Sequence, residues 1–284
     1  MKWSHIKKVS PNDLDLNYIA SPSAYLRYMQ EAAHMHMLAC PPTPDELKAE
    51  SKVFVLSRVS MSVRRPLHAC DTIRVSTWAC AGHGATFPRC VEVSVLCPGI
   101  EENRQDGYSG PAGGFDCAEG AGKMNPAEDA AEGEWVTAAV LSSEWALLNT
   151  SGHTLCRASD YPHDFSPEAA VQPDLPVRFR MPKDAVFEYV GDYTAVYGDV
   201  DLNRHVNNAR YPDIFCGYLP SMDGLAVKNM TISYIHEIPL GHTVKIYVSS
   251  LEGGFGVRSV LEDGSISAEA YIATVPVSEL DIQA

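Results

Sequence analysis

One short run of the sequence carries an acid, an amide and an imidazole at alternate positions. Asp201, Asn203 and His205 lie in the segment DVDLNRHVNNARY, residues 199–211. A histidine titrates near neutral pH and can act as a general acid or base, and a nearby carboxylate can fix its tautomer. If this segment is a turn that enters a helix, the helix N-terminal amides near residues 206–208 can stabilise an oxyanion. These side chains are therefore the first candidates for a hydrolytic site.

The same pattern occurs near the start of the chain. Residues 13–29 read DLDLNYIASPSAYLRYM, and residues 199–215 read DVDLNRHVNNARYPDIF. The acids and the amide recur without a gap, but Ile19 takes the place of His205. A duplicated unit can keep the Asp and the Asn only as turn and cap residues, so these two do not by themselves indicate catalysis. His205 occurs in the second copy only and is the residue that points to a catalytic role.

The segments that follow the two copies are also alike. Helix-forming residues cover 23–38 in the first half and 208–219 in the second, and Pro41 and Pro42 end the first run. Runs rich in β-branched residues then follow at 53–65, 71–80, 87–97 and 134–149, and at 227–238, 243–252, 255–262 and 265–275. We therefore predict an α+β protein with two tandem hotdog domains, each a long helix wrapped by a curved antiparallel sheet.

The length of 284 residues also suggests two domains. We assign residues 1–150 to an N-terminal hotdog domain, 151–176 to a linker, and 177–284 to a C-terminal hotdog domain that carries the candidate site. Residues 98–132 are rich in glycine, alanine, proline and acids with few β-branched residues, which predicts a flexible insertion.

Composition excludes several classes of function. Hydrophobic residues make up 45% of the chain and charged residues 20%, as in water-soluble globular proteins. No apolar run resembles a secretory signal or a membrane span, so we expect a cytoplasmic protein with no membrane partner. A net charge of −14 disfavours binding to nucleic acid. The eight cysteines are scattered and never form CxxC, so we expect reduced thiols, no metal and no cofactor.

The pattern as a whole resembles the acyl-acyl carrier protein (acyl-ACP) thioesterases of plants and bacteria. Their motif has an Asp, an Asn and a His at alternate positions, then Val-Asn-Asn and a Tyr, as in residues 199–211. Family-like stretches also lie in order at 21–34, 53–78 and 144–162. The resemblance to bacterial members implies a double hotdog enzyme that hydrolyses fatty acyl thioesters on acyl carrier protein and so ends fatty acid synthesis.

Four catalytic residues follow from this resemblance. Asp201, Asn203 and His205 fall on the motif, and Glu237 supplies the family's glutamate in its Tyr-x-x-Glu context. Plant members carry a cysteine next, where this chain has Ile238, so a cysteine mechanism is not available there. We expect Glu237 to activate water, Asp201 to fix the tautomer of His205, and Asn203 to orient the water or the thioester oxygen. Direct attack by Asp201 is the alternative.

Substrate contacts are also implied by the resemblance, because the first half of the family supplies most of the acyl tunnel. The expected substrate-binding residues are Tyr25, Met29, Val55, Trp78, Asn207, Asn208, Arg204 and Arg210. The last two are cations near the site that could dock acyl carrier protein and its phosphopantetheine-linked acyl chain. His236 is expected on the opposite face of its strand from Glu237. A coenzyme A thioesterase and a non-catalytic acyl-thioester binder are the alternative functions, and monomer and homodimer are both open.

Overall fold

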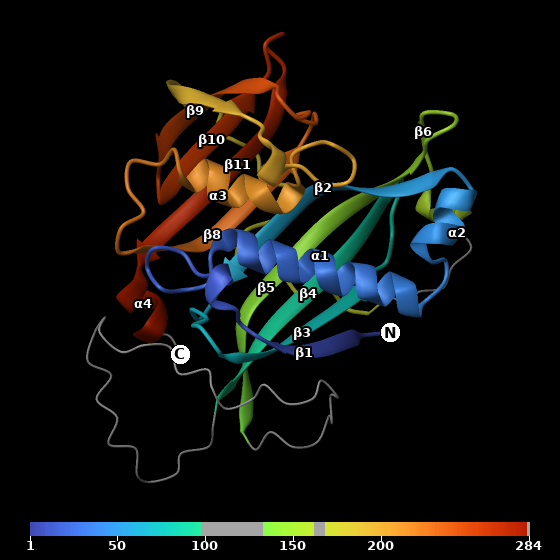
Figure 1. The fold of residues 1–284 in the computed structure, drawn as a ribbon, viewed down its shortest axis with the longest axis horizontal. Coiled ribbons are helices and arrows are strands. Elements are labelled where there is room, and N and C mark those ends of the chain that lie inside the picture. Colours follow the sequence, from blue (N-terminus) through green and yellow to red (C-terminus); the bar gives the residue numbers. More distant parts are fainter. Residues whose placement is uncertain (98–132, 162–167, 283–284) are drawn as a thin grey trace.

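The computed structural model describes residues 1–97, 133–161 and 168–282. The predicted insertion at 98–132 lies outside the described residues, as does part of the predicted linker, 162–167. The described strands form one antiparallel sheet (Figure 1). In the first half these are β1 (Trp3–Lys8), β2 (Lys52–Val63), β3 (Thr72–Ala79), β4 (Thr86–Cys97), β5 (Glu134–Asn149) and the short β6 (Thr154–Leu155). In the second half they are β7 (Glu188–Thr194), β8 (Leu225–Tyr234), β9 (Thr243–Leu251), β10 (Gly254–Val260) and β11 (Ile266–Pro276).

The order of the strands is symmetric about the centre of the sheet. It runs β1-β3-β4-β5-β2-β8-β11-β10-β9-β7, with β6 on β5. Outward from β2 the neighbours are β5, β4, β3 and β1, and outward from β8 they are β11, β10, β9 and β7. The halves join where β2 pairs with β8, from Arg58↔Ser233 to Ser62↔Asn229. This symmetry is what a duplicated hotdog unit produces, and it confirms the predicted fold class.

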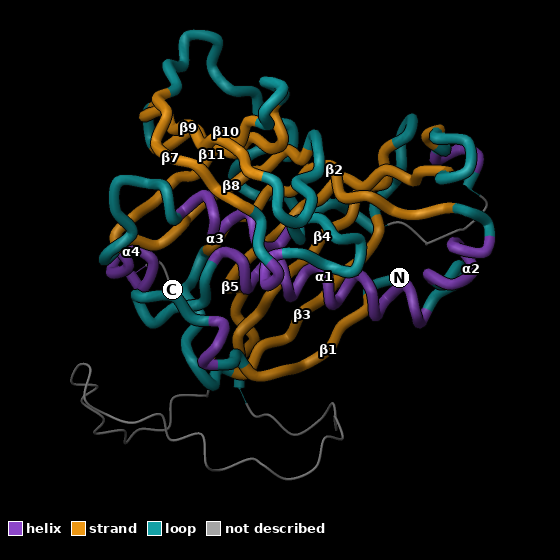
Figure 2. Tube along the Cα trace, turned by 45° about the horizontal axis from the view of Figure 1, so that its top comes forward, coloured by secondary structure: helices purple, strands orange, loops and turns teal. Residues whose placement is uncertain are grey.

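The long helix of the first half is α1 (Pro22–Ala39), close to the predicted 23–38. It begins because the side chain of Ser21 accepts a hydrogen bond from the amide of Ala24 and proline occupies its first turn. It ends at Cys40, before two prolines that cannot continue it. Figure 1 shows α1 lying across the strands of the first half, and Figure 2 shows that α3 lies on the same side of the sheet.

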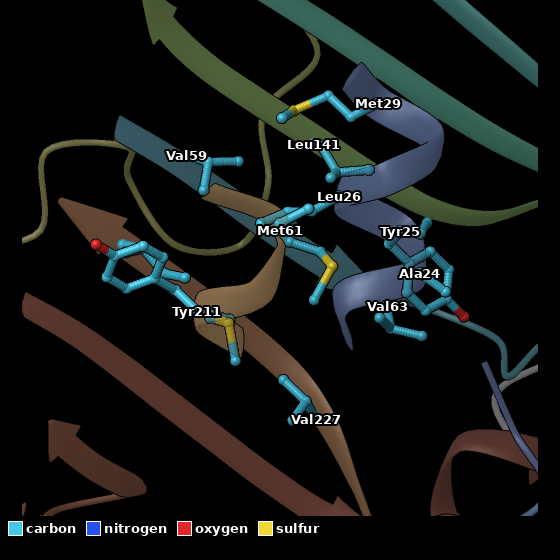
Figure 3. Close-up of a cluster of buried hydrophobic side chains, with 14 of the residues drawn as sticks. Ala24, Tyr25, Leu26, Met29, Val59, Met61, Val63, Leu141, Tyr211 and Val227 are labelled. Atoms are coloured by element: carbon cyan, nitrogen blue, oxygen red, sulfur yellow. The ribbon is translucent and has the colours of Figure 1, made fainter. Parts of the chain in front are cut away.

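The core of the molecule lies between this helix layer and the sheet. Figure 3 shows Met29 of α1 near Leu141 of β5, in one cluster with Met61 of β2 and with Tyr211 and Val227 of the second half. All five are buried, with Met29 and Leu141 at 0% exposure. Burying each such apolar side chain contributes about 1.5–3 kcal/mol, so one shared core holds the two halves together.

The helix of the second half is much shorter than the predicted 208–219. A 3-10 turn covers Asn208–Arg210, α3 covers Tyr211–Cys216, and the chain then leaves the helix. The amide of Tyr218 bonds the carbonyl of Phe215, which is tighter than the α-helical spacing, and the Tyr218 hydroxyl donates to the carbonyl of Asp192. The helix ends at Gly217, a residue type common just past a helix end, and the Tyr218 contacts hold the segment that follows.

Several described elements had no counterpart in the predicted set. They are the edge strands β1 and β7, the short strand β6, the helices α2 (Pro44–Ala49) and α4 (Val277–Ile282), and 3-10 turns at Pro11–Asp13, Ala158–Asp160 and Tyr197–Asp199. Cys70 is disulfide-bonded, so the expectation of reduced thiols is wrong at that residue. Within the described part of the chain, every helix is too short or too polar to cross a membrane.

Candidate active site

The loop that carries the acid, the amide and the imidazole is a tight turn. The amide of Asp201 donates to the carbonyl of His205 (3.0 Å), and the Asp201 carboxylate accepts from the backbone amide of Asn203 (2.8 Å). Arg204 has a positive φ of 69°, which is uncommon for a residue with a side chain. Asp201 therefore fixes the turn that presents His205 at the surface of the sheet.

The first copy of the repeat has the same turn. The amide of Asp15 donates to the carbonyl of Ile19 (2.8 Å), its carboxylate accepts from the amide of Asn17 (2.8 Å), and Tyr18 has a φ of 61°. Ile19 is buried, whereas the side chain of His205 is 31% exposed. The two turns thus share a backbone, and only the second presents an imidazole.

The two asparagines of the repeat are used differently. The Asn17 amide donates to the carbonyls of Met222 (2.8 Å) and Leu225 (2.9 Å), and its oxygen accepts from the amide of Gly224 (2.8 Å). It therefore ties the loop after α3 to the first half. The side chain of Asn203 makes no hydrogen bond to any described residue and faces a cavity. Its amide is thus free for a ligand.

His205 contacts the predicted glutamate. Its Nδ1 lies 3.0 Å from a carboxylate oxygen of Glu237. Backbone pairing holds the two segments side by side, because His205 bridges to Pro239 and the amide of Val206 donates to the carbonyl of Ile238 (2.9 Å). A carboxylate on Nδ1 fixes the tautomer that leaves Nε2 as a hydrogen-bond acceptor.

This pair borders a cavity of about 620 Å³, the site cavity. Its polar wall contains all four predicted catalytic residues together with the predicted Asn207 and Asn208. Its apolar wall comes largely from β2 and β5 of the first half. The remaining lining residues are Gln30, Val53, Phe54, Val55, Leu56, Trp145, Leu148, Val206, Tyr211, Tyr234, Ile235 and His236. The site is therefore built from both halves of the chain.

Two expectations about the polar groups need correction. Glu237 is the carboxylate on the imidazole, whereas the Asp201 carboxylate is bonded within its own turn. The backbone amides of Val206 and Asn207 are occupied by the carbonyls of Ile238 and Asp199, both at 2.9 Å. Among the amides at 206–208, that of Asn208 alone lacks a partner among the described residues.

Two tyrosines, Tyr211 and Tyr234, also line the site cavity next to its polar residues. The Tyr234 hydroxyl donates to the carbonyl of Asn208 (2.9 Å), and the rings of Tyr211 and Tyr234 meet edge to face at 5.2 Å. Burial raises the pKa of Tyr211 to about 12, and burial also raises the pKa of Tyr234 well above its ordinary value. Both hydroxyls therefore stay protonated and support the site rather than titrate in it.

The predicted substrate contacts divide into two groups. Val55, like Asn207 and Asn208, lines the site cavity. Tyr25, Met29 and Trp78 do not, because their side chains are buried in the core or bonded elsewhere. Arg204 and Arg210 also lie outside its lining. Arg210 is committed to Asp199 (3.1 Å), so Arg204, whose side chain is exposed, is the free cation of the two.

His236 lines the site cavity, although strand alternation placed it on the opposite face. The alternation fails because β8 ends at Tyr234. The amides of Ile235 and His236 both bond the carbonyl of Ser267, at 2.8 and 2.9 Å, which turns the chain. The sequence signal that could have revealed this is absent, since the apolar run continues to Ile238. Across the described residues, no group of three or more His, Cys, Asp or Glu side chains could hold a metal.

A family model matches the half of the chain that carries this polar wall. The model of the acyl-ACP thioesterase C-terminal domain covers residues 185–273, which contain the turn at Asp201 and also Glu237. Residues 185–273 are therefore similar to the C-terminal domain of acyl-ACP thioesterases. A search of curated protein sequences finds no match to the chain.

Solved acyl-ACP thioesterases share the fold along nearly the whole chain. An acyl-ACP thioesterase from Bacteroides thetaiotaomicron is 15% identical, with a TM-score of 0.69 over 96% of this chain and 98% of its own. The 12:0-ACP thioesterase from Umbellularia californica is 17% identical, with a TM-score of 0.70 over 97% of each chain. At these identities the likeness establishes the double hotdog fold.

Proposed function

We propose that the chain hydrolyses fatty acyl thioesters on acyl carrier protein and releases free fatty acids. The observation that carries this proposal is the contact of His205 with Glu237 at the wall of the site cavity, within residues that match the acyl-ACP thioesterase family. An apolar wall from β2 and β5 offers a place for an acyl chain, and the polar wall offers groups that can act on its thioester.

In the proposed mechanism His205 is the general base. The Glu237 carboxylate accepts a hydrogen bond from Nδ1–H, so Nε2 is free to take a proton from a water molecule. The water oxygen attacks the thioester carbonyl carbon, and the carbonyl oxygen takes up the negative charge. The Asn203 side-chain amide and the Asn208 backbone amide are the donors available to that oxygen. When the carbon–sulfur bond breaks, the thiolate takes the proton back from Nε2.

A second route starts from Asp201. Its carboxylate lines the same cavity and is placed to attack the carbonyl carbon directly. The carbon–sulfur bond then breaks, the thiolate leaves and takes a proton from solvent, and water hydrolyses the resulting acyl anhydride. The backbone amide of Asn203 bonded to one carboxylate oxygen lowers the nucleophilicity of that oxygen, so we favour the route through His205.

The carrier protein is the proposed partner, and its acidic surface requires a local cation on this acidic chain. Arg204 is exposed and adjacent to His205, so we propose that it contacts the phosphate of the phosphopantetheine arm. We also propose that residues 1–150 and 177–284 act as the two domains of a monomer, because β2 and β8 already form within one chain the pairing that would otherwise need two copies.

The substrate is tested by comparing carriers for identical acyl groups. Purified protein is given octanoyl to hexadecanoyl groups on acyl carrier protein and on coenzyme A, and both free thiol and free fatty acid are measured. We expect kcat/KM to be at least about tenfold higher on the carrier protein, as a docking contact provides. Equal or greater rates on coenzyme A contradict the choice of carrier, and binding without turnover on either carrier contradicts hydrolysis.

A further inference from the structure

A second cavity of about 290 Å³, the distal cavity, lies in the first half of the molecule. Phe54, Phe87 and Tyr161 meet in its wall, with pairwise ring-centroid distances of 5.2–5.9 Å and edge-to-face geometry. Most of its other lining residues are apolar, and one is an arginine, Arg89. None of the expected catalytic residues lies in this cavity.

The distal cavity adjoins the site cavity along α1. Phe54 and Trp145 line both of them. On α1, Gln30 lines the site cavity, while Ala33 and Met37 line the distal cavity. Residues three and seven positions apart share one helical face, and seven residues rise about 10 Å. The α1 face that begins at Gln30 therefore leads toward the distal cavity, and Phe54 and Trp145 stand between the two cavities.

Arg89 is the exceptional group in the distal cavity. It is only 9% exposed, on β4, and its Nη1 donates to the hydroxyl of Thr77 (3.1 Å) and to Nδ1 of His36 (3.0 Å). Both partners are neutral. Thr77 carries no charge, and burial and the neighbouring Arg89 charge lower the pKa of His36 to about 4. No carboxylate among the described residues forms an ion pair with Arg89. A buried charge without an ionic partner is costly to the fold.

The thiols near Arg89 do not neutralise its charge. Burial lowers the pKa of Arg89 to about 10, and this outweighs the opposite effect of the thiols of Cys80, Cys40 and Cys90. The guanidinium is still protonated at neutral pH, and it has donors besides Nη1. An apolar cavity with one desolvated cation is suited to an apolar chain that ends in a hydrogen-bond acceptor, and least suited to a chain that ends in a methyl group.

We propose that the distal cavity receives the far end of the acyl chain and that Arg89 binds an oxygen-bearing group there, with a carboxylate as the strongest ligand. This inference rests on the proposed function, since it assumes that the thioester lies in the site cavity. It makes Arg89 a specificity residue for acyl chains that carry a terminal carboxylate, hydroxyl or keto group.

The test uses paired thioesters of equal length on acyl carrier protein. Each pair, from octanoyl to hexadecanoyl, has one member with a terminal methyl and one with a terminal carboxylate, and terminal hydroxyl compounds form a third arm. We expect kcat/KM for the best carboxylate compound to exceed that of its methyl partner about tenfold or more. Arg89→Met removes the charge with little loss of volume, and should reverse this preference. Arg74→Met is the matched control, because Arg74 lies over the Trp135 ring outside the cavity, and should leave the ratio unchanged.

Binding of the free acids keeps this inference separate from the proposed hydrolysis. Dodecanedioic and dodecanoic acids are titrated into the wild-type protein and Arg89→Met, and dissociation constants are measured by calorimetry. Tighter binding of the diacid that is lost in Arg89→Met supports the Arg89 site even if no thioester is hydrolysed. The inference is overturned if the wild-type protein turns over the methyl-ended thioester faster at every length and binds dodecanoic acid more tightly than dodecanedioic acid. This outcome does not depend on whether Arg89→Met folds.

Discussion

Nδ1 of His205 lies 3.0 Å from a carboxylate oxygen of Glu237, and this contact joins the turn after β7 to the segment after β8. The equivalent position in the first turn is Ile19, which is buried. One duplicated backbone therefore carries a core residue in one copy and an imidazole with a carboxylate partner in the other. The difference between the copies is the clearest chemical feature of the chain.

Glu237→Gln is expected to lower kcat by about a hundredfold or more, because loss of the carboxylate removes the charge that orients and supports His205 as a base. KM should change little, since the mutated group does not hold the acyl chain. Steady-state hydrolysis of one acyl-ACP substrate measures both. Glu252→Gln is the control, because Glu252 is an exposed residue in the turn between β9 and β10. An unchanged kcat in Glu237→Gln contradicts the assigned role.

The two asparagines of the repeat give a matched pair of variants. Asn17→Ala should lower the free energy of unfolding by about 1–3 kcal/mol, because three backbone groups of the loop at 222–225 lose their partner. Asn203→Ala should leave stability nearly unchanged and lower kcat, because its side chain faces the cavity. Urea denaturation and turnover of both variants separate the effects. Equal losses of stability in the two variants contradict a structural role for Asn17 and a catalytic role for Asn203.

An isotope experiment tests for the covalent route in which the anhydride is hydrolysed at the Asp201 carbonyl carbon. In a single turnover in ¹⁸O-labelled water, attack by water on the thioester places ¹⁸O in the fatty acid. Attack by Asp201 followed by hydrolysis at its own carbonyl carbon leaves unlabelled product and puts ¹⁸O into the Asp201 side chain. We expect labelled fatty acid, measured by mass spectrometry with excess enzyme. Label in the peptide that contains Asp201 supports the covalent route instead.

The hydrogen bonds of the Asp199 carboxylate lead us to expect that the protein loses stability toward unfolding at acid pH. Burial raises the pKa of this carboxyl, but hydrogen bonds from Tyr193 (2.7 Å) and Arg210 (3.1 Å) outweigh burial and hold its pKa below the ordinary 3.8. The pKa of Asp199 is therefore lower in the folded protein than in the unfolded chain. Its contribution to the free energy of unfolding is present above pH 3.8 and is lost as the pH falls through the pKa of the folded state. Asp199→Asn should show a shallower decline in unfolding free energy at acid pH than the wild type. Parallel declines contradict this.

Much of the fold could be predicted from the sequence because its signals are local. The prolines at 41 and 42 marked the end of α1 in the sequence, and the repeat implied the symmetric sheet. The end of α3 was missed, although Gly217 directly follows its last residue and glycine is common just past a helix end. The edge strands β1 and β7 were missed because each is stabilised mainly by its one neighbour in the sheet.

The site was less predictable than the fold. His205 was identifiable by comparison of the two copies, but Glu237 followed only from the resemblance. Its contact with His205 depends on where β8 ends, which no local signal marked. The wall residues Phe54 and Trp145 lie in ordinary apolar runs, and only the packing of the two halves places them between two cavities. Arg89 was equally hidden, because nothing in the run at 87–97 marks its side chain as buried.

Single-turnover release of thiol from acyl carrier protein by His205→Ala tests the central claim most directly. The folded variant, checked by its unfolding midpoint, is compared with the wild type and with His68→Ala, which changes an exposed histidine outside both cavities. We predict a rate at least about a hundredfold below wild type for His205→Ala and an unchanged rate for His68→Ala. A folded His205→Ala protein that releases thiol at the wild-type rate contradicts the assignment of His205 as the base.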